Sequence, residues 1–120
     1  MAGVETRSFD SPDETRTPEK TKVDVVKLSN TNAARLTLEP GWSWADCIKP
    51  VVGTDTCELR HVGVAMSGSM HVAHDDGTEL EIGPGEAYLI EPGHNAWVVG
   101  DEPFVGLEFE SKSAEEYAKS

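Results

Sequence analysis

Short stretches in which apolar and polar residues alternate recur along most of this chain. The stretches KVDVVKLS and AARLTLEP have the two-residue period of half-buried strands. Further strand-like segments follow, separated by glycine, proline and aspartate: CELRHVGVAMSG, SMHVAHDDGTELEI, AYLIEPG, NAWVVGDEP and FVGLEFE. The DDGT sequence is typical of a hairpin turn. Because a single small sheet would leave one face or its edges exposed, the pattern predicts an all-β protein, a sandwich or closed two-sheet barrel.

The two ends of the chain depart from this pattern. Residues 1–21 are charged, contain proline and hold almost no large apolar residue apart from Phe9, which is typical of a flexible arm. The end of the chain, SAEEYAKS, predicts a short helical tail over residues 112–120. A chain of 120 residues fits one domain. We therefore expect residues 22–111 to form the barrel.

The charge of the chain narrows the choice of partners. Ten Lys and Arg residues against 22 Asp and Glu residues give a net charge of −12. The negative electrostatic field of such a chain repels phosphate backbones and anionic lipid, so we expect neither nucleic acid nor a membrane surface as a partner. The first residues have no apolar core of a signal peptide, and no stretch is long and apolar enough to span a bilayer. These features predict a cytoplasmic protein.

Two cysteines, Cys47 and Cys57, lie ten residues apart. In a cytoplasmic protein such a pair is more often two free thiols than a disulfide. There is no CxxC pair, which excludes a structural zinc knuckle.

The stretch VAMSGSMHVAHDDGTELEIGPGEAYLIEPGHNAW resembles the cupin superfamily, whose members are small jelly-roll β-barrels. The resemblance covers residues 36–110, with Gly68 ending the first cupin motif and Gly85 beginning the second. It implies a double-stranded β-helix of the RmlC-like type and a homodimer. It also leaves a second placement of residues 1–21 open, along the barrel edge or against a second subunit.

The ligands of metal-binding cupins are not in their usual places. The resemblance places two His and a Glu in the first motif, but these positions hold Asp55, Cys57 and His61. The His position of the second motif holds Ala96. An ordinary cupin iron or manganese site is therefore not expected.

A rearranged metal site remains one of two open interpretations. Cys57, His61 and His94, with Asp55 as a further candidate, are chemically suited to a divalent Zn, Fe or Cu ion, with Mn the family alternative. On a straight strand, Cys57 and His61 would lie about 13 Å apart, so they converge only if the chain turns between them. Since His94 is displaced by two residues from Ala96, spacing alone argues against a shared site. The other interpretation is that these residues are ordinary packed side chains.

Alternation along a strand predicts on which face of the sheet each remaining histidine lies, and the aromatic residues form a separate group. His71 is predicted on the outer face and His74 beside the hairpin turn, both as surface residues. The aromatic residues predict either core packing or a pocket for a small ligand, lined by Trp42, Trp44, Trp97 and Met70.

Three functions follow, and the sequence leaves them open. The first is a binding protein that holds a small molecule in the barrel interior, with or without a divalent metal. The second is a metal-dependent enzyme of dioxygenase or isomerase type that uses His61, Cys57 and His94. The third is a regulatory or scaffolding domain without metal. A Cys57–His61 nucleophile is disfavoured, because the sequence shows no third residue that would orient the imidazole.

Overall fold

The computed structural model describes residues 3–109, so the predicted helical tail at 112–120 lies outside the described residues. The strands of the first sheet are β1 (Glu14–Arg16), β2 (Thr21–Lys27), β3 (Asn32–Leu38), β4 (His61–Ser67), β7 (Ala87–Ile90) and β9 (Phe104–Phe109). Those of the second are β5 (Ser69–His74), β6 (Glu79–Ile82) and β8 (His94–Val99). Two short helices, α1 (Trp44–Cys47) and α2 (Lys49–Val52), lie between β3 and β4.

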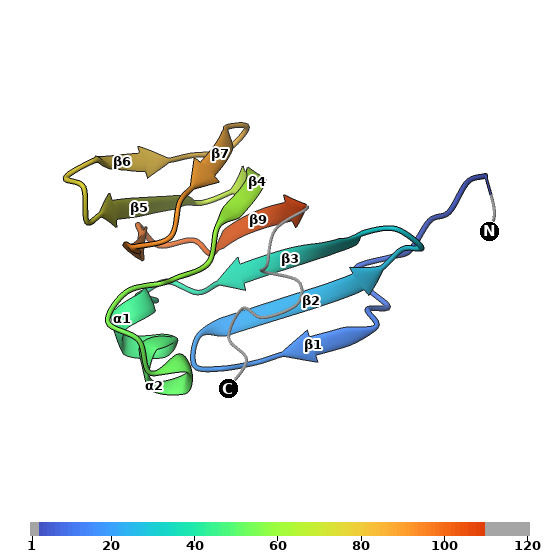
Figure 1. Cartoon of the computed structure of the whole chain (residues 1–120), viewed down its shortest axis with the longest axis horizontal. Helices are drawn as coiled ribbons and strands as arrows, with labels where there is room; N and C mark the ends of the chain where they lie inside the picture. The colour runs from blue at the N-terminus through green and yellow to red at the C-terminus, as the bar shows by residue number, and fades with distance from the viewer. Residues whose placement is uncertain (1–2, 110–120) are drawn as a thin grey trace.

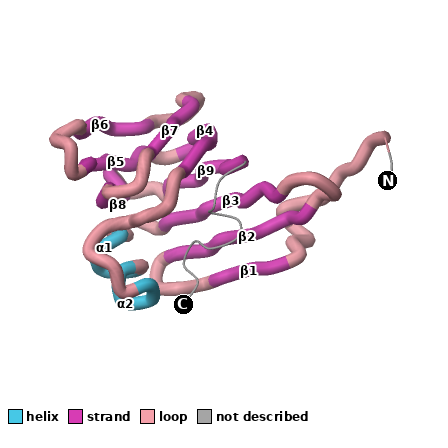
Figure 2. Tube along the Cα trace, in the orientation of Figure 1, coloured by secondary structure: helices cyan, strands magenta, loops and turns pink. Residues whose placement is uncertain are grey.

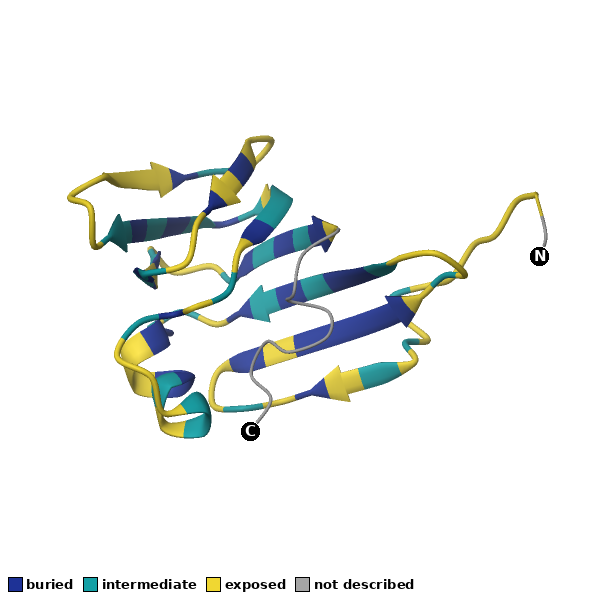
Figure 3. Ribbon diagram, viewed as in Figure 1, coloured by how far each residue is buried: buried dark blue, intermediate teal, exposed yellow. Residues whose placement is uncertain are grey.

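The two sheets are antiparallel, with strand orders β1-β2-β3-β9-β4-β7 and β6-β5-β8 (Figures 1 and 2). The connection from β4 to β5 passes from the larger sheet to the smaller, and the connection from β6 to β7 passes back to the larger sheet. The apolar residues of the alternating stretches form one core, which includes Leu36, Ala65, Val72 and Phe104. Figure 3 shows the resulting pattern, with β2 largely buried and β6 largely exposed. The all-β jelly-roll prediction is confirmed.

The turns that the sequence marks hold the sheets in register. DDGT joins β5 to β6 as predicted, and Oδ1 of Asp76 accepts a hydrogen bond of 2.8 Å from the backbone N–H of Thr78. Gly68, between β4 and β5, has a φ of +73°, and a Cβ there would lie 2.2 Å from the carbonyl oxygen of Pro103. Only glycine fits this crossing between the sheets.

The arm at the start of the chain lies along the sheet edge. Strand β1 pairs with β2, with Glu14 opposite Val25. Before it, the guanidinium of Arg35 donates hydrogen bonds of 3.2 Å to the Asp10 carboxylate and to the Phe9 carbonyl oxygen. Of the two placements that the sequence left open, the described part of the arm has the packed one.

The helices between β3 and β4 were not expected from the sequence. Trp44 begins α1, and Trp42 lies just before it, outside any strand. Ser43 caps this helix, because its Oγ accepts a hydrogen bond of 3.1 Å from the backbone N–H of Asp46. Each helix has four residues, which is too short for a helical period to be visible in the sequence. In the described part of the chain, no helix has the length and hydropathy to cross a membrane.

Candidate metal centre

Cys57, His61 and His94 come together in the barrel interior. Cys57 and His94 face each other in an isolated antiparallel bridge, in which the N–H of Cys57 donates to the carbonyl oxygen of His94 at 2.8 Å. The N–H of Gly93 donates to the carbonyl oxygen of Cys57 at the same distance. His61 is the first residue of β4, and its ring centroid lies 5.0 Å from that of His94. His94, displaced by two residues from the family position, thus reaches the same interior point as His61.

The distance expected for a straight strand does not apply to Cys57 and His61. Cys57 precedes β4, and the chain between the two residues is not a strand. Cys57 Sγ consequently lies 3.5 Å from Nε2 of His61. Zinc bonds of about 2.3 Å to sulfur and 2.0–2.1 Å to nitrogen, at a tetrahedral angle, would separate the two ligand atoms by about 3.6 Å. The observed spacing is that of a hydrogen bond between the thiol and the imidazole, and it also fits two ligands of one ion.

The three side chains offer a compact, buried donor set. One ligand atom from each lies within 4.8 Å of the others, and 3–4 % of each residue is exposed. A thiolate with two imidazoles is a combination that binds zinc, copper or iron. In the described part of the chain, this is the one cluster of three or more His, Cys, Asp or Glu residues with that spacing.

Hydrogen bonds fix which nitrogen of each imidazole is available as a ligand. Nδ1 of His61 donates to Oε1 of Glu108 at 2.8 Å, and Nδ1 of His94 donates to the carbonyl oxygen of Glu91 at 2.7 Å. In its neutral form, each ring then presents Nε2 as its unprotonated nitrogen. Metal-binding histidines are typically held in this way, by a carboxylate or a carbonyl on the opposite nitrogen.

Glu108 is the residue that the sequence analysis missed. It is buried in β9, where Oε2 accepts a hydrogen bond of 2.8 Å from the hydroxyl of Tyr88. Alternation along FVGLEFE places Glu108 on the same inward face as Phe104 and Gly106, both of them buried. A carboxylate at an inward position of a strand is the signal that could have identified it.

The cluster strongly perturbs the acidity of its members. Burial raises the pKa of Cys57, but hydrogen bonds with His61 and His94 and the charge of these imidazoles outweigh it and lower the pKa to about 6. Burial lowers the pKa of His61, but the Glu108 carboxylate, the hydrogen bonds and the Cys57 thiolate raise it to about 10. Without a metal, Cys57 and His61 therefore form a thiolate–imidazolium pair at neutral pH.

Two of the predicted site residues lie elsewhere. Asp55 is fully exposed, 3.7 Å from Nζ of Lys49, and so stands outside the cluster despite sharing the parity of Cys57. Residues two apart share a face only in a strand, and residues 53–56 form an irregular loop instead. Trp97 is 38 % exposed and stacks on His71, with ring centroids 4.7 Å apart, on the outer face of the smaller sheet. It does not line the interior.

Trp42, Trp44 and Met70 do line the interior, beside His61 and His94. The cavity that they enclose is only about 20 Å³, which is room for a single water molecule or ion. Both cysteines are free and buried, as expected for two thiols.

One of the lining residues has an unsatisfied polar atom. Nε1 of Trp44 is buried and has no hydrogen-bond acceptor among the described residues. An orphaned buried donor costs about 1–3 kcal/mol unless an acceptor occupies the space beside it. The residue that carries this donor is one of those that line the cavity.

The two other histidines are surface residues, as predicted. His71 lies on the outer face and its Nε2 is 2.6 Å from the Glu79 carboxylate. Nε2 of His74 donates to the carbonyl oxygen of Pro92 at 2.8 Å, beside the hairpin turn.

Comparison with solved structures places this fold. No protein-family model matches the chain, and no curated protein sequence matches it. It is similar to an oxalate decarboxylase from Lactobacillus farciminis, with a TM-score of 0.61 and 15 % identity over 91 % of this chain. The match spans only 33 % of the oxalate decarboxylase chain.

Two further solved structures show the same likeness over more of their own length. A cupin-superfamily sugar phosphate isomerase from Silicibacter pomeroyi has a TM-score of 0.60 and 17 % identity, covering 88 % of this chain and 74 % of the other. A Rhizobium leguminosarum protein of unknown function also has a TM-score of 0.60 and 17 % identity, covering 90 % and 97 %. The chain thus has the cupin fold, and its interior holds a Cys/His/His cluster.

Proposed function

We propose that this protein is a small cupin that binds one transition-metal ion through Cys57, His61 and His94. The observation that carries the proposal is the pair of Nδ1 hydrogen bonds, to Glu108 and to the Glu91 carbonyl, which leave both Nε2 atoms available beside the thiol. Ordinary packed histidines need no such common orientation. The spacing of Sγ and Nε2 supports the same conclusion.

Charge balance supports a divalent ion. A Cys57 thiolate and a Glu108 carboxylate together carry two negative charges in an apolar interior, where unpaired charge is costly. One divalent cation, with both imidazoles neutral, would make the buried group neutral overall. Thiolate and imidazole favour zinc, copper or iron, whereas manganese prefers carboxylate and water.

The protein's own residues would define the space beside the ion. When bound, the ion would supply Lewis acidity at a position open to one further ligand. Met70, Ile90, Ala96 and Phe104 make much of that space apolar. A cavity of about 20 Å³ has room for a single water molecule or ion, so a larger molecule would have to bind elsewhere.

Metal analysis of tag-free protein tests this proposal. The protein is depleted with a chelator, incubated separately with zinc, iron, copper and manganese, freed of excess ion and measured by elemental analysis. We expect about one ion per chain in the natural protein and in Cys47→Ser, which removes the other buried thiol. We expect strong loss in Cys57→Ser and in the His61→Ala, His94→Ala double variant. Failure to retain any of the four metals would overturn the proposal.

A metal-dependent enzyme is the second candidate function. It is favoured by the donor set itself, since three protein ligands with one open position are typical of catalytic zinc sites. Oxygen consumption by the metal-loaded protein with a panel of small acids would test the dioxygenase form of this candidate. The homodimer and the cytoplasmic location remain predictions of the sequence.

A further inference from the structure

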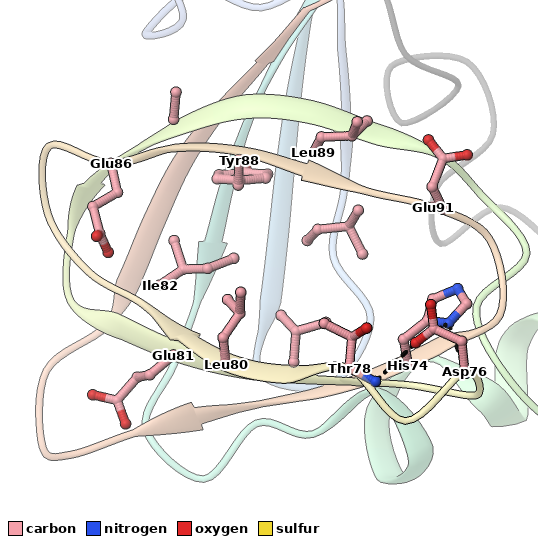
Figure 4. Close-up of a pocket in the computed structure, with 13 residues that line it drawn as sticks. His74, Asp76, Thr78, Leu80, Glu81, Ile82, Glu86, Tyr88, Leu89 and Glu91 are labelled. Atoms are coloured by element: carbon pink, nitrogen blue, oxygen red, sulfur yellow. Dashed lines mark hydrogen bonds and ion pairs between the residues drawn. The ribbon is translucent and has the colours of Figure 1, made fainter.

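A second and much larger hollow lies between the two sheets, at β6 and β7. These strands are the terminal strands of their sheets, so each has one edge that pairs with no other strand between residues 3 and 109. The space between them is a groove of about 530 Å³, in the range of small-molecule sites (Figure 4). We call it the β6–β7 groove.

Backbone groups of both strands face this groove. The N–H of His74 donates to the carbonyl oxygen of Thr78, and since bonded pairs alternate in an antiparallel ladder, Leu80 and Ile82 bond to β5. The peptide groups of Glu81 are then directed to the open edge. By the same alternation from the bond between Ala65 and Glu86, those of Ala87 and Leu89 are directed to the open edge of β7. The groove therefore offers backbone donors and acceptors on both sides.

The wall between these edges is apolar. Val72, Ile82, Tyr88 and Ile90 line it from strands of both sheets. At its rim, Leu80 and Leu89 are 52 % and 57 % exposed, although they are large apolar side chains. Burying them and the wall behind them would favour an apolar ligand.

The charges around the groove are of one sign. Carboxylates of Asp76, Glu86 and Glu91 lie along it, whereas the side chain of Glu81 points away from it (Figure 4), and the described lining residues include neither Lys nor Arg. The one basic side chain is His74, whose ring nitrogens are already engaged by the Pro92 carbonyl oxygen and the Asp76 N–H. Glu91 is paired with Arg60, and Oε1 of Glu86 accepts a hydrogen bond from the Gly83 N–H but has no cationic partner among the described residues. A negatively charged ligand would meet repulsion here, whereas a cation would be attracted.

We propose that the β6–β7 groove binds a small molecule with an apolar body and a cationic end, of the class of arylalkyl or alkyl amines. The apolar body packs on Val72, Ile82 and Tyr88, and the ammonium group lies toward Glu86 and the backbone carbonyl groups of the open edges. This inference deepens the small-molecule part of the predicted function and rests on the groove, not on the metal cluster.

A matched pair of probes tests both halves of the proposal. 1-Naphthylmethylamine and 1-naphthoate have the same ring system and opposite charges at neutral pH. Each is titrated into the full chain, with fluorescence as the readout and amide NMR shifts to locate binding. We expect the amine to bind at least about fivefold more tightly than the naphthoate, with the difference shrinking at high salt. We expect the shifted amides to lie in β6 and β7.

Three variants assign the binding to the groove. Leu80→Gln should weaken amine binding about fivefold, because it removes part of the apolar contact area. Met66→Gln is the matched control, since Met66 is 54 % exposed and does not line the groove; it should change nothing. Glu86→Gln should lower the preference for the amine over the naphthoate.

Each contrary result is decisive. Naphthoate binding as tightly as the amine, equal effects of Leu80→Gln and Met66→Gln, or no binding of either probe at millimolar concentration would overturn the proposal. Metal content and thermal unfolding measured on the same samples keep this failure distinct from a failure of the proposed metal site or of folding.

Discussion

The carboxylate of Glu108 holds the imidazole of His61, with 2.8 Å between Oε1 and Nδ1. Glu108 comes from β9 and His61 from β4, neighbouring strands of one sheet. The hydroxyl of Tyr88 on β7 occupies the other carboxylate oxygen. Three strands thus fix the direction in which Nε2 of His61 faces, and that direction is toward Cys57.

Glu108→Gln should weaken metal binding without removing a metal ligand. The amide oxygen can still accept from His61 or Tyr88, but the negative charge that increases the basicity of the imidazole is lost. Changes to such supporting residues typically cost about 10–100-fold in affinity. Competition with a chromophoric chelator gives the measurement, with Glu79→Gln, on the exposed His71 pair, as the control. Equal affinities of Glu108→Gln and the natural protein would show that Glu108 does not support the ligand.

The metal-free protein should contain a thiolate at neutral pH. With the pKa of Cys57 near 6, against an ordinary value of 9.0, the thiolate absorbance should appear as the pH rises through about 6. The experiment uses Cys47→Ser, which leaves Cys57 as the single thiol, and His61→Ala in that background should move the transition upward. A transition near pH 9 in the Cys47→Ser protein would contradict the proposed pair.

The same pair predicts how stability depends on pH. The lowered pKa of Cys57 contributes stability that is present above pH 9.0 and is lost as the pH falls toward 6. The raised pKa of His61, about 10 against 6.5, contributes stability that is present below pH 6.5 and is lost as the pH rises toward 10. Between pH 6.5 and 9.0 the two slopes are opposite, so the pair's contribution to the free energy of unfolding of metal-free protein should be nearly flat. Urea unfolding of metal-free Cys47→Ser across this range measures it. In Cys47→Ser/Cys57→Ser the contribution of Cys57 that rises with pH is absent, so the two proteins should differ increasingly as the pH rises; parallel pH dependences of the two would contradict the assignment.

Gly68→Ala should destabilise the fold far more than Gly85→Ala. Both glycines have positive φ, +73° and +83°, and an alanine costs about 1–2 kcal/mol in such a conformation. At Gly68 the added Cβ also collides with the backbone of Pro103 and Phe104, whereas at Gly85 nothing lies within 4 Å. Thermal unfolding of the two variants provides the comparison. Similar losses at the two positions would mean that the crossing between the sheets tolerates a side chain.

The sequence predicted the strands well because their alternation reports directly on burial. It predicted the hairpin at Asp76 and the outward placement of His71 for the same reason. Alternation assigns residues to one face only within a strand. Residues 53–56 form a loop, so Cys57 is buried in the cluster whereas Asp55 is exposed outside it. The short helices after Ser43 also gave no periodic signal.

The composition of the candidate site was only partly predictable. Ligand type identified Cys57, His61 and His94, but their convergence depends on the bend before β4 and on the Cys57–His94 bridge, which spacing alone does not reveal. Glu108 lies 47 residues from His61, so only the pairing of β4 with β9 brings the two side chains together.

The cobalt(II) spectrum of the reconstituted protein tests the metal site most directly. Cobalt replaces zinc in sites of this kind, and thiolate coordination adds a charge-transfer band in the near ultraviolet to the visible bands of a four-coordinate ion. We expect both features at one equivalent of cobalt in the natural protein and in Cys47→Ser, and loss of the charge-transfer band in Cys57→Ser. A spectrum without the thiolate band, or one that Cys57→Ser leaves unchanged, would contradict it.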